Sequence, residues 1–165
     1  MKKRLLGRIG IAIIMLYIFS GCNQEMTEIK AEQNLPQIYT QAFDSFMPLD
    51  AGLNSNMEYI AIDMTGLNLN AQDKATILDY FKKYKVTVME ASFDDLKQKS
   101  LFDEKHMILN GILLSIKKVD IKSDTKVQIE GSKYRSGNGA IGVVTTIIYM
   151  DNSWQIDKAD ITWIS

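Results

Sequence analysis

The feature that most constrains the fold of this chain is a series of four β-rich runs in its last third. These runs are rich in β-branched and aromatic residues, and they cover residues 112–121, 126–134, 141–150 and 154–164. Turn-forming sequences separate them, namely Ser123-Asp124, Ser136 to Gly139 and Asp151-Asn152. Short strands joined by such turns pair with their neighbours along the chain, so the sequence predicts a four-stranded antiparallel β-meander.

The last of these runs changes its alternation part-way along. Trp154 and Ile156 have one parity, whereas Ile161 and Trp163 have the other. A β-bulge adds one residue to a strand and shifts the parity beyond it, so we expect a bulge near Ala159. Both tryptophans are then expected to fill the core on the concave side of the sheet, because aromatic rings bury the largest apolar area.

Three helices are predicted ahead of the strands. The first begins near Pro36, which suits the first turn of a helix, and its apolar face continues to Met47. The second begins after Asn70, which caps free backbone N–H groups well. The third covers residues 93–101 and follows a serine and an aspartate, three residues apart, that resemble a capping box. Two short segments, residues 57–63 and 86–89, are expected to be extended.

This order of elements predicts an α+β fold class in which N-terminal helices pack on a curved four-stranded antiparallel β-meander. With its closing segment MDNSWQIDKADITWIS, the chain resembles the cystatin-like or NTF2-like cone fold over residues 35–165. The segments GSKYRSGNGAIG and ITWIS also resemble a group of short, uncharacterised lipoproteins of Bacillus-type bacteria. No catalytic motif accompanies either resemblance, so neither assigns a functional residue.

The N-terminus has the signals of a bacterial lipoprotein. A basic start is followed by an apolar run from Ile9 to Phe19 and by small residues, as in a secretory signal peptide. Ser20-Gly21-Cys22 resembles a lipobox, although Phe19 stands where leucine is usual. The resemblance implies that Cys22 carries a diacyl or triacyl lipid. We therefore predict a lipoprotein signal peptide over residues 1–21, a lipidated Cys22 with a polar tether over 22–34, and a single α+β domain over 35–165. A plain secreted form and an uncleaved membrane anchor are the alternatives.

Charge and cysteine content limit the partners and cofactors. Four of the 19 Lys and Arg residues precede Cys22 and all 20 Asp and Glu residues follow it, so the chain from Cys22 onward has a net charge of −5. This acidity argues against nucleic acid as a partner and against a polybasic hold on anionic lipid. The membrane partner is therefore expected to be reached through the lipid on Cys22. Cys22 is the only cysteine, so we expect neither a disulfide nor a thiolate metal site.

The remaining motifs favour structural roles. The G-x-G-x-x-G sequence at residues 137–142 precedes a strand-like run, so we interpret Asn138-Gly139 as a hairpin turn and expect no cofactor. His106 is the only histidine, which is too few ligands for zinc, and no nucleophile motif accompanies it. We therefore expect no catalytic residue and no metal. Asp95, Asp120 and Asp124 lack the spacing of a calcium loop.

The leading hypothesis is an extracytoplasmic, membrane-anchored, non-enzymatic domain that binds a ligand or a protein. Its expected pocket is the concave sheet closed by the helices, with Tyr59, Tyr134 and Arg135 as candidate rim residues. One alternative is an adaptor or interaction subunit of a membrane transporter or cell-wall machine. A second alternative is an enzyme on an NTF2-like scaffold, with His106 or a carboxylate as its base.

Overall fold

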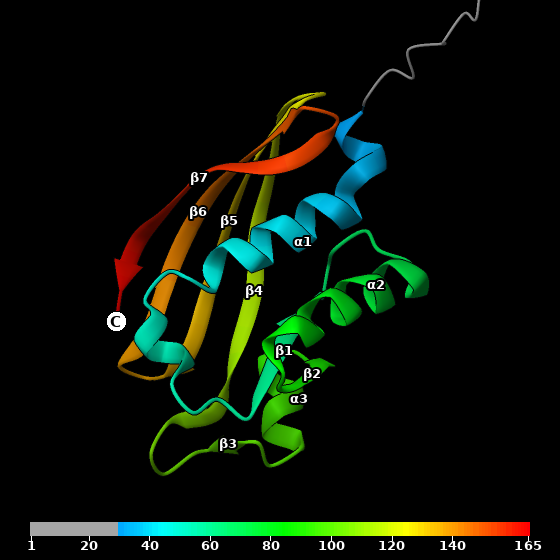
Figure 1. Cartoon of the computed structure of the whole chain (residues 1–165). Helices are drawn as coiled ribbons and strands as arrows, with labels where there is room; N and C mark the ends of the chain where they lie inside the picture. The colour runs from blue at the N-terminus through cyan, green and yellow to red at the C-terminus, as the bar shows by residue number, and fades with distance from the viewer. Residues whose placement is uncertain (1–29) are drawn as a thin grey trace, which may run out of the picture.

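The computed structural model describes residues 30–165, which form one mixed β-sheet with helices on both of its faces (Figure 1). The α-helices are α1 (Leu35–Phe46), α2 (Ala71–Phe81) and α3 (Phe93–Gln98), and three short 3₁₀ helices are η1 (Ala31–Asn34), η2 (Ala51–Asn54) and η3 (Lys82–Tyr84). The strands are β1 (Tyr59–Asp63), β2 (Thr87–Glu90), β3 (Phe102–Asp103), β4 (Ile108–Ser123), β5 (Lys126–Ser136), β6 (Gly139–Met150) and β7 (Ser153–Ile164).

The sheet has the strand order β2-β1-β4-β5-β6-β7, with β3 paired to β4 off this path. Strands β4 to β7 pair antiparallel, whereas β1 pairs parallel with both β2 and β4. The predicted fold class is therefore wrong: the chain folds around a seven-stranded mixed sheet, not a four-stranded antiparallel meander covered by N-terminal helices. Parallel neighbours need a crossover connection, which α2 provides between β1 and β2. No local sequence pattern predicts which strand will pair with the strand that follows a crossover, so the parallel pairing of β1 with β2 and β4 was not predicted.

Two of the three α-helices begin at capping boxes. The sequence predicts the box at Ser92 and the N-cap role of Asn70, and the structure adds the reciprocal bond from Asp73. Asn70 Oδ1 accepts a hydrogen bond from the Asp73 amide at 2.9 Å, and the Asp73 carboxylate accepts one from the Asn70 amide at 3.1 Å. Ser92 and Asp95 make the same reciprocal pair before α3. Each box satisfies backbone N–H groups that have no partner within the helix, which is worth about 1 kcal/mol.

Helix α1 crosses one face of β4–β7 (Figure 1). Its aromatic side chains pack into the core on that face. Phe43 and Phe46 from α1, together with Phe81 and Trp154, are buried in one cluster. Gly131 in β5 allows the close approach of α1, because a Cβ atom there would lie 2.5 Å from the Phe46 ring. The helix-covered face, where we expected a ligand pocket, is therefore packed core.

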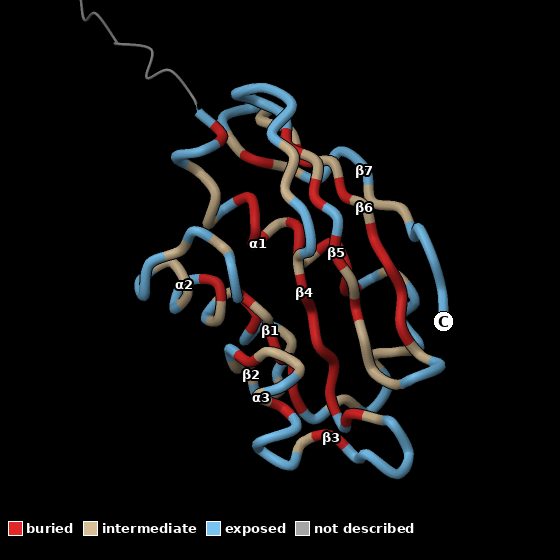
Figure 2. The backbone as a smooth tube through the Cα atoms, turned by 180° about the vertical axis from the view of Figure 1, so that it is seen from behind, coloured by how far each residue is buried: buried red, intermediate tan, exposed pale blue. Residues whose placement is uncertain are grey.

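A second apolar cluster lies on the opposite, outer face of the sheet. Successive residues of a strand point to opposite faces. Ile60 and Ile62 of β1 join the core under α1 and α2. Tyr59 and Ala61 pack instead with Leu96 of α3. Helix α3 thus covers β1 and the first part of β4, and it leaves the rest of the outer face of β4–β7 without a helix (Figure 2).

Strand β7 has two register irregularities, rather than the single bulge that the sequence predicts. The first leaves Asp157 unmatched with β6 and keeps Ile161 on the same face as Trp154. The second leaves Thr162 unmatched and turns Trp163 to the outer face. Trp154 is buried at 2 % exposure, as predicted, but the core position predicted for Trp163 is wrong, since it is 49 % exposed.

The hairpin between β5 and β6 turns at Gly137-Asn138, one residue before the predicted Asn138-Gly139 pair. Neither turn residue has a positive φ, so the turn does not use the left-handed conformation that motivated the prediction. The G-x-G-x-x-G sequence leads into β6 and not into the helix that a dinucleotide site requires. The next turn, Asp151-Asn152, has φ values of 51° and 62°, as in a type I′ hairpin.

Candidate functional site

The outer face of β4–β7 carries a row of small residues that runs across the strands. Ser115 in β4 lies opposite Ser132 in β5, and Ser132 lies opposite Gly142 in β6. The two serine hydroxyls share a hydrogen bond of 2.9 Å. Gly142 in turn lies opposite Trp163 in β7. Because residues in one such row point to the same face, the small side chains leave space above the sheet, and Trp163 borders that space.

The Trp163 indole lies across Gly142. A Cβ atom on Gly142 would lie 2.0 Å from the indole Nε1, so any larger residue would displace the ring from the strand. The backbone supports one side of the ring, yet the residue remains half exposed. Trp163 therefore presents an aromatic surface to solvent, with the Gly142 backbone behind it.

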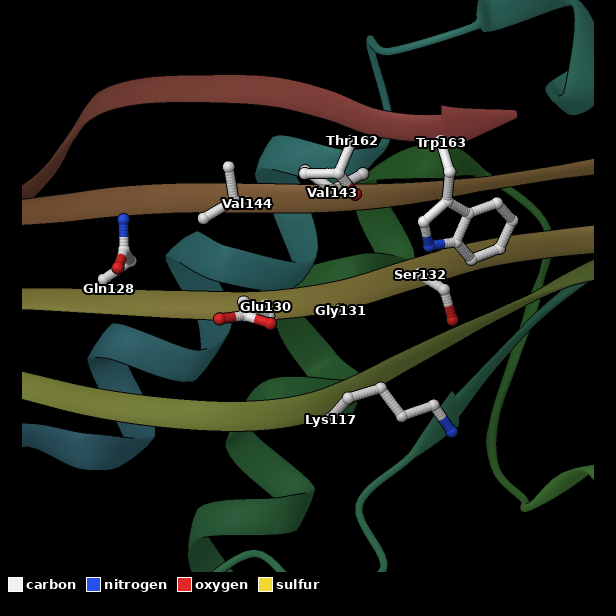
Figure 3. A pocket seen from close by; sticks show the side chains of 9 residues that line it. All are labelled: Lys117, Gln128, Glu130, Gly131, Ser132, Val143, Val144, Thr162 and Trp163. Carbon is white, nitrogen blue, oxygen red and sulfur yellow. The ribbon is translucent and has the colours of Figure 1, made fainter.

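The space beside the ring is a hollow of about 480 Å³, which we call the Trp163 hollow. The side chains of Gln128, Glu130, Ser132, Val144 and Trp163 project from the side of the sheet opposite to α1 (Figure 3), whereas the Val143 side chain belongs to the core under α1. The hollow is lined by Lys117, Gln128, Glu130, Gly131, Ser132, Val143, Val144, Thr162 and Trp163.

Several polar side chains of the hollow have no protein partner. Glu130 pairs with Lys118 at 3.1 Å. Lys117, Gln128 and Thr162, by contrast, make no side-chain hydrogen bond or ion pair with any residue of the 30–165 segment. Their donors and acceptors face water and are available to a ligand.

Apart from Lys117, several charges around the hollow occur in pairs of opposite sign. Lys158 and Asp160 of β7 lie 2.7 Å apart, and the hydrogen bond from Lys158 to Asp160 raises the pKa of Lys158. On β4, the hydrogen bond from Lys122 lowers the pKa of Asp120. With both signs interspersed, the outer face has no strong field of either sign.

Of the three predicted rim residues, Tyr59 and Tyr134 both belong to the second apolar cluster, whereas Arg135 lies apart from them at η2. Tyr59 is buried in the second cluster and donates from its hydroxyl to the Leu101 carbonyl at 3.1 Å. Tyr134 packs edge-on against Phe93, with ring centroids 5.4 Å apart. The Arg135 guanidinium donates to backbone carbonyls next to η2. In the structure these residues support the fold of β1, α3 and η2.

A fully buried lysine holds the segment between α1 and β1. Lys133 of β5 points to the α1 side and donates from Nζ to the carbonyl oxygens of Met47, Leu49 and Asp50 and to Asn54 Oδ1. Burial lowers the pKa of Lys133 to about 8. With every donor position used on its own chain, Lys133 is a structural clamp.

A polar cluster on the other side of α1 is likewise satisfied internally. The Asp44 carboxylate accepts hydrogen bonds from the Tyr80 hydroxyl at 2.9 Å and the Tyr84 hydroxyl at 2.6 Å. Lys83 Nζ lies 2.8 Å from Asp44 and 3.9 Å from the centre of the Tyr80 ring. Burial, followed by the hydrogen bond to Asp44, raises the pKa of Tyr84. These contacts join α1 to α2 and η3.

His106 lies in an exposed loop between β3 and β4. Its Nδ1 lies 2.6 Å from Asp103 Oδ2, and this hydrogen bond lowers the pKa of Asp103. Residues 30–165 contain no group of three or more His, Cys, Asp or Glu side chains that could hold a metal ion. Asp103 forms an Asx-type turn, in which its Oδ1 accepts hydrogen bonds from the backbone N–H groups of Lys105 and His106. The His106 ring adds a contact to the other carboxylate oxygen.

The predicted lipidation site, Cys22, lies outside the described residues. No helix within residues 30–165 has the length and apolar character to span a membrane. Comparison of the chain with protein-family models, curated proteins and solved structures found no significant match. The proposed function therefore rests on the sequence and structure of this chain alone.

Sequence reasoning missed the Trp163 hollow and the Lys133 clamp. The signal for the clamp was present in the sequence. Alternation along β5 puts Lys133 on the same face as Val127 and Ile129, which are both buried, so its burial could have been predicted. The outward position of Trp163 depends on a bulge at Thr162. β7 contains no glycine that would indicate that bulge.

Proposed function

We propose that this chain is an extracytoplasmic lipoprotein, held at the membrane by lipid on Cys22, and that it is a non-enzymatic binding domain. Its binding surface is the outer face of β4–β7 around the Trp163 hollow. The anchor is supported by the basic start, the short apolar run and the Ser20-Gly21-Cys22 sequence. A stable hold by acylation needs more than one chain, which a diacyl or triacyl cysteine supplies.

The observation that carries the proposal is the exposed Trp163 ring, backed by Gly142. A large aromatic side chain left half exposed beside a hollow loses the free energy that its burial in the core would give. Tryptophan is also the residue type most enriched where binding energy concentrates. The geometry therefore favours a contact surface at this point.

Other regions of the described chain fit structural roles better. The helix-covered face is filled by Phe43, Phe46, Phe81 and Trp154. The Lys133 clamp and the Asp44 cluster use their polar atoms on neighbouring segments. His106 pairs with Asp103 in a solvent-exposed loop, and within residues 30–165 its ring has no hydrogen bond to a serine, threonine or other nucleophile.

Site-specific photocrosslinking in intact cells tests the proposal. Gln128, in the hollow, and Gln72, exposed on α2, are each replaced by p-benzoylphenylalanine in the full-length lipoprotein. Benzophenone inserts into C–H bonds of proteins, lipids and glycans alike. We expect a discrete adduct from position 128 and none from position 72. Equal labelling at both positions, or no adduct at either, would contradict the proposed surface.

A further inference from the structure

Resting on the proposed function, we infer that the Trp163 hollow is a carbohydrate-binding site for a chain of equatorially substituted pyranoses, such as a β-1,4-linked glycan. Such sugars have a flat C–H face and a rim of hydroxyl groups. A site for them needs an exposed aromatic ring and, around it, polar groups that are free to hydrogen-bond. The hollow has both.

The aromatic component is Trp163. Its ring lies against the backbone at Gly142, which limits the orientations that the indole can take on that side before a ligand arrives. Pre-ordering of this kind lowers the entropy cost of binding. The side chains in the row of Ser115, Ser132 and Gly142 are short, so they leave space beside the ring for a second sugar unit.

The polar component consists of the groups around that space. Lys117 offers N–H donors, Gln128 offers both donors and an acceptor, and Thr162 offers a hydroxyl. None of the three has a side-chain partner within the described part of the chain. Glu130 adds a carboxylate that is half exposed. Hydrogen bonds from sugar hydroxyls to charged groups are the stronger ones.

The distribution of apolar residues favours a glycan over a protein partner. A protein interface has an apolar centre made of several residues. The exposed Ile156, Ile161 and Ile164 of β7 belong to the face that packs toward α1. Around the hollow, the apolar lining comes from Trp163, Val143 and Val144. The other lining side chains are polar, and they belong to Lys117, Gln128, Glu130, Ser132 and Thr162.

The test uses the full-length lipoprotein in a detergent without a sugar headgroup, and its probes are chitotetraose and cellotetraose. Calorimetry and the fluorescence of Trp163, in a Trp154→Phe background, report binding. We expect saturable binding of at least one tetrasaccharide. Trp163→Ala should weaken binding tenfold or more. Gly142→Ala, which keeps the indole but displaces it, should weaken binding to a similar degree.

Ile164→Ala is the matched control, because Ile164 is an exposed apolar residue on the other face of β7, and it should bind as wild type does. Circular dichroism must show that each variant is folded. The inference is wrong if neither tetrasaccharide binds the wild type, or if Trp163→Ala binds with unchanged affinity. A protein adduct at position 128 without oligosaccharide binding would contradict the carbohydrate inference, but it would still support the outer face of β4–β7 as the binding surface.

Discussion

At the scale of single residues, Lys133 has the greatest structural consequence. Its ammonium group is completely buried and serves as donor to four oxygen atoms of the segment between α1 and β1. Such carbonyl oxygens, once buried, cost free energy when they have no donor. A neighbouring contact from Arg135 to the Leu53 carbonyl at 2.7 Å supports the same segment. Two basic residues of β5 therefore fix the chain where it leaves α1.

Replacing Lys133 with methionine should destabilise the fold. Methionine keeps most of the side-chain volume but removes the donors, so we expect the free energy of unfolding to fall by about 2–4 kcal/mol. Chemical denaturation at pH 7 measures this change. Lys118→Met is the control, because Lys118 is exposed and its pair with Glu130 lies at the surface. The control should cost less than about 1 kcal/mol. Equal costs for the two variants would contradict the clamp.

The lowered pKa of Lys133 gives this effect a defined pH dependence. The group has a pKa of about 8 in the folded chain and 10.5 as its ordinary value. Between these values the unfolded chain binds a proton that the folded chain has released, so the unfolding free energy rises with pH. The stability difference between wild type and Lys133→Met should therefore grow from pH 8 to pH 10. Denaturation curves of both proteins across this range measure it, and a constant or shrinking difference would contradict it.

Residue-level prediction from sequence succeeded where the signal was local. The capping partners of Asn70 and Ser92 lie three residues away, and both boxes form. The roles of Tyr59 and Tyr134 depend on α3, which packs against them from a distant part of the chain. No short pattern distinguishes a tyrosine at a pocket rim from one beneath a helix.

At the scale of secondary-structure elements, the contact between α1 and the sheet depends on Gly131. A Cβ atom there would lie 2.5 Å from both the Phe46 ring and the Ser115 carbonyl oxygen. Both neighbours are held in place, one by the helix and the other by the β4 backbone. We expect Gly131→Ala to cost about 1–3 kcal/mol by pushing α1 away from β5. Thermal and chemical denaturation measure this cost.

Gly137→Ala provides the matched comparison for that variant. At Gly137 the nearest atom to a new Cβ would be the Met107 Cβ at 3.6 Å, which is an ordinary contact. This substitution in the exposed hairpin should change stability by less than about 0.5 kcal/mol. If the two alanine variants were equally stable, close packing of α1 on β5 would not be the reason for glycine at residue 131.

The positions of the elements were more predictable than their pairing. Alternation and turn residues located β4 to β7, since each hairpin brings together strands that are neighbours in sequence. The parallel pairing of β1 with β4 joins segments separated by α2, β2 and α3. The bulge that turns Trp163 outward also arises from pairing with β6, so the candidate site could not be read from β7 alone.

At the scale of the whole molecule, one sheet separates two unlike surfaces. The face toward α1 and α2 holds the main core, and the opposite face is covered by α3 on one side only (Figure 2). A protein held at a membrane by a lipid needs no further membrane contact from its folded part. Under the proposed lipid anchor, the open sheet face of this chain is free for a ligand, which agrees with the paired charges around the Trp163 hollow.

The last prediction concerns the proposed lipid anchor. The net charge of −5 from Cys22 onward gives no attraction to an anionic membrane. Attachment should therefore depend on acylation of Cys22. In cells fed a labelled fatty acid, the wild-type chain should carry the label, and Cys22→Ala should remain an unlabelled, uncleaved precursor. Trp163→Ala should be labelled and processed as the wild type is, since it alters the proposed ligand surface alone. Label on the Cys22→Ala chain, or a wild type without label, would show that the membrane is reached by another route.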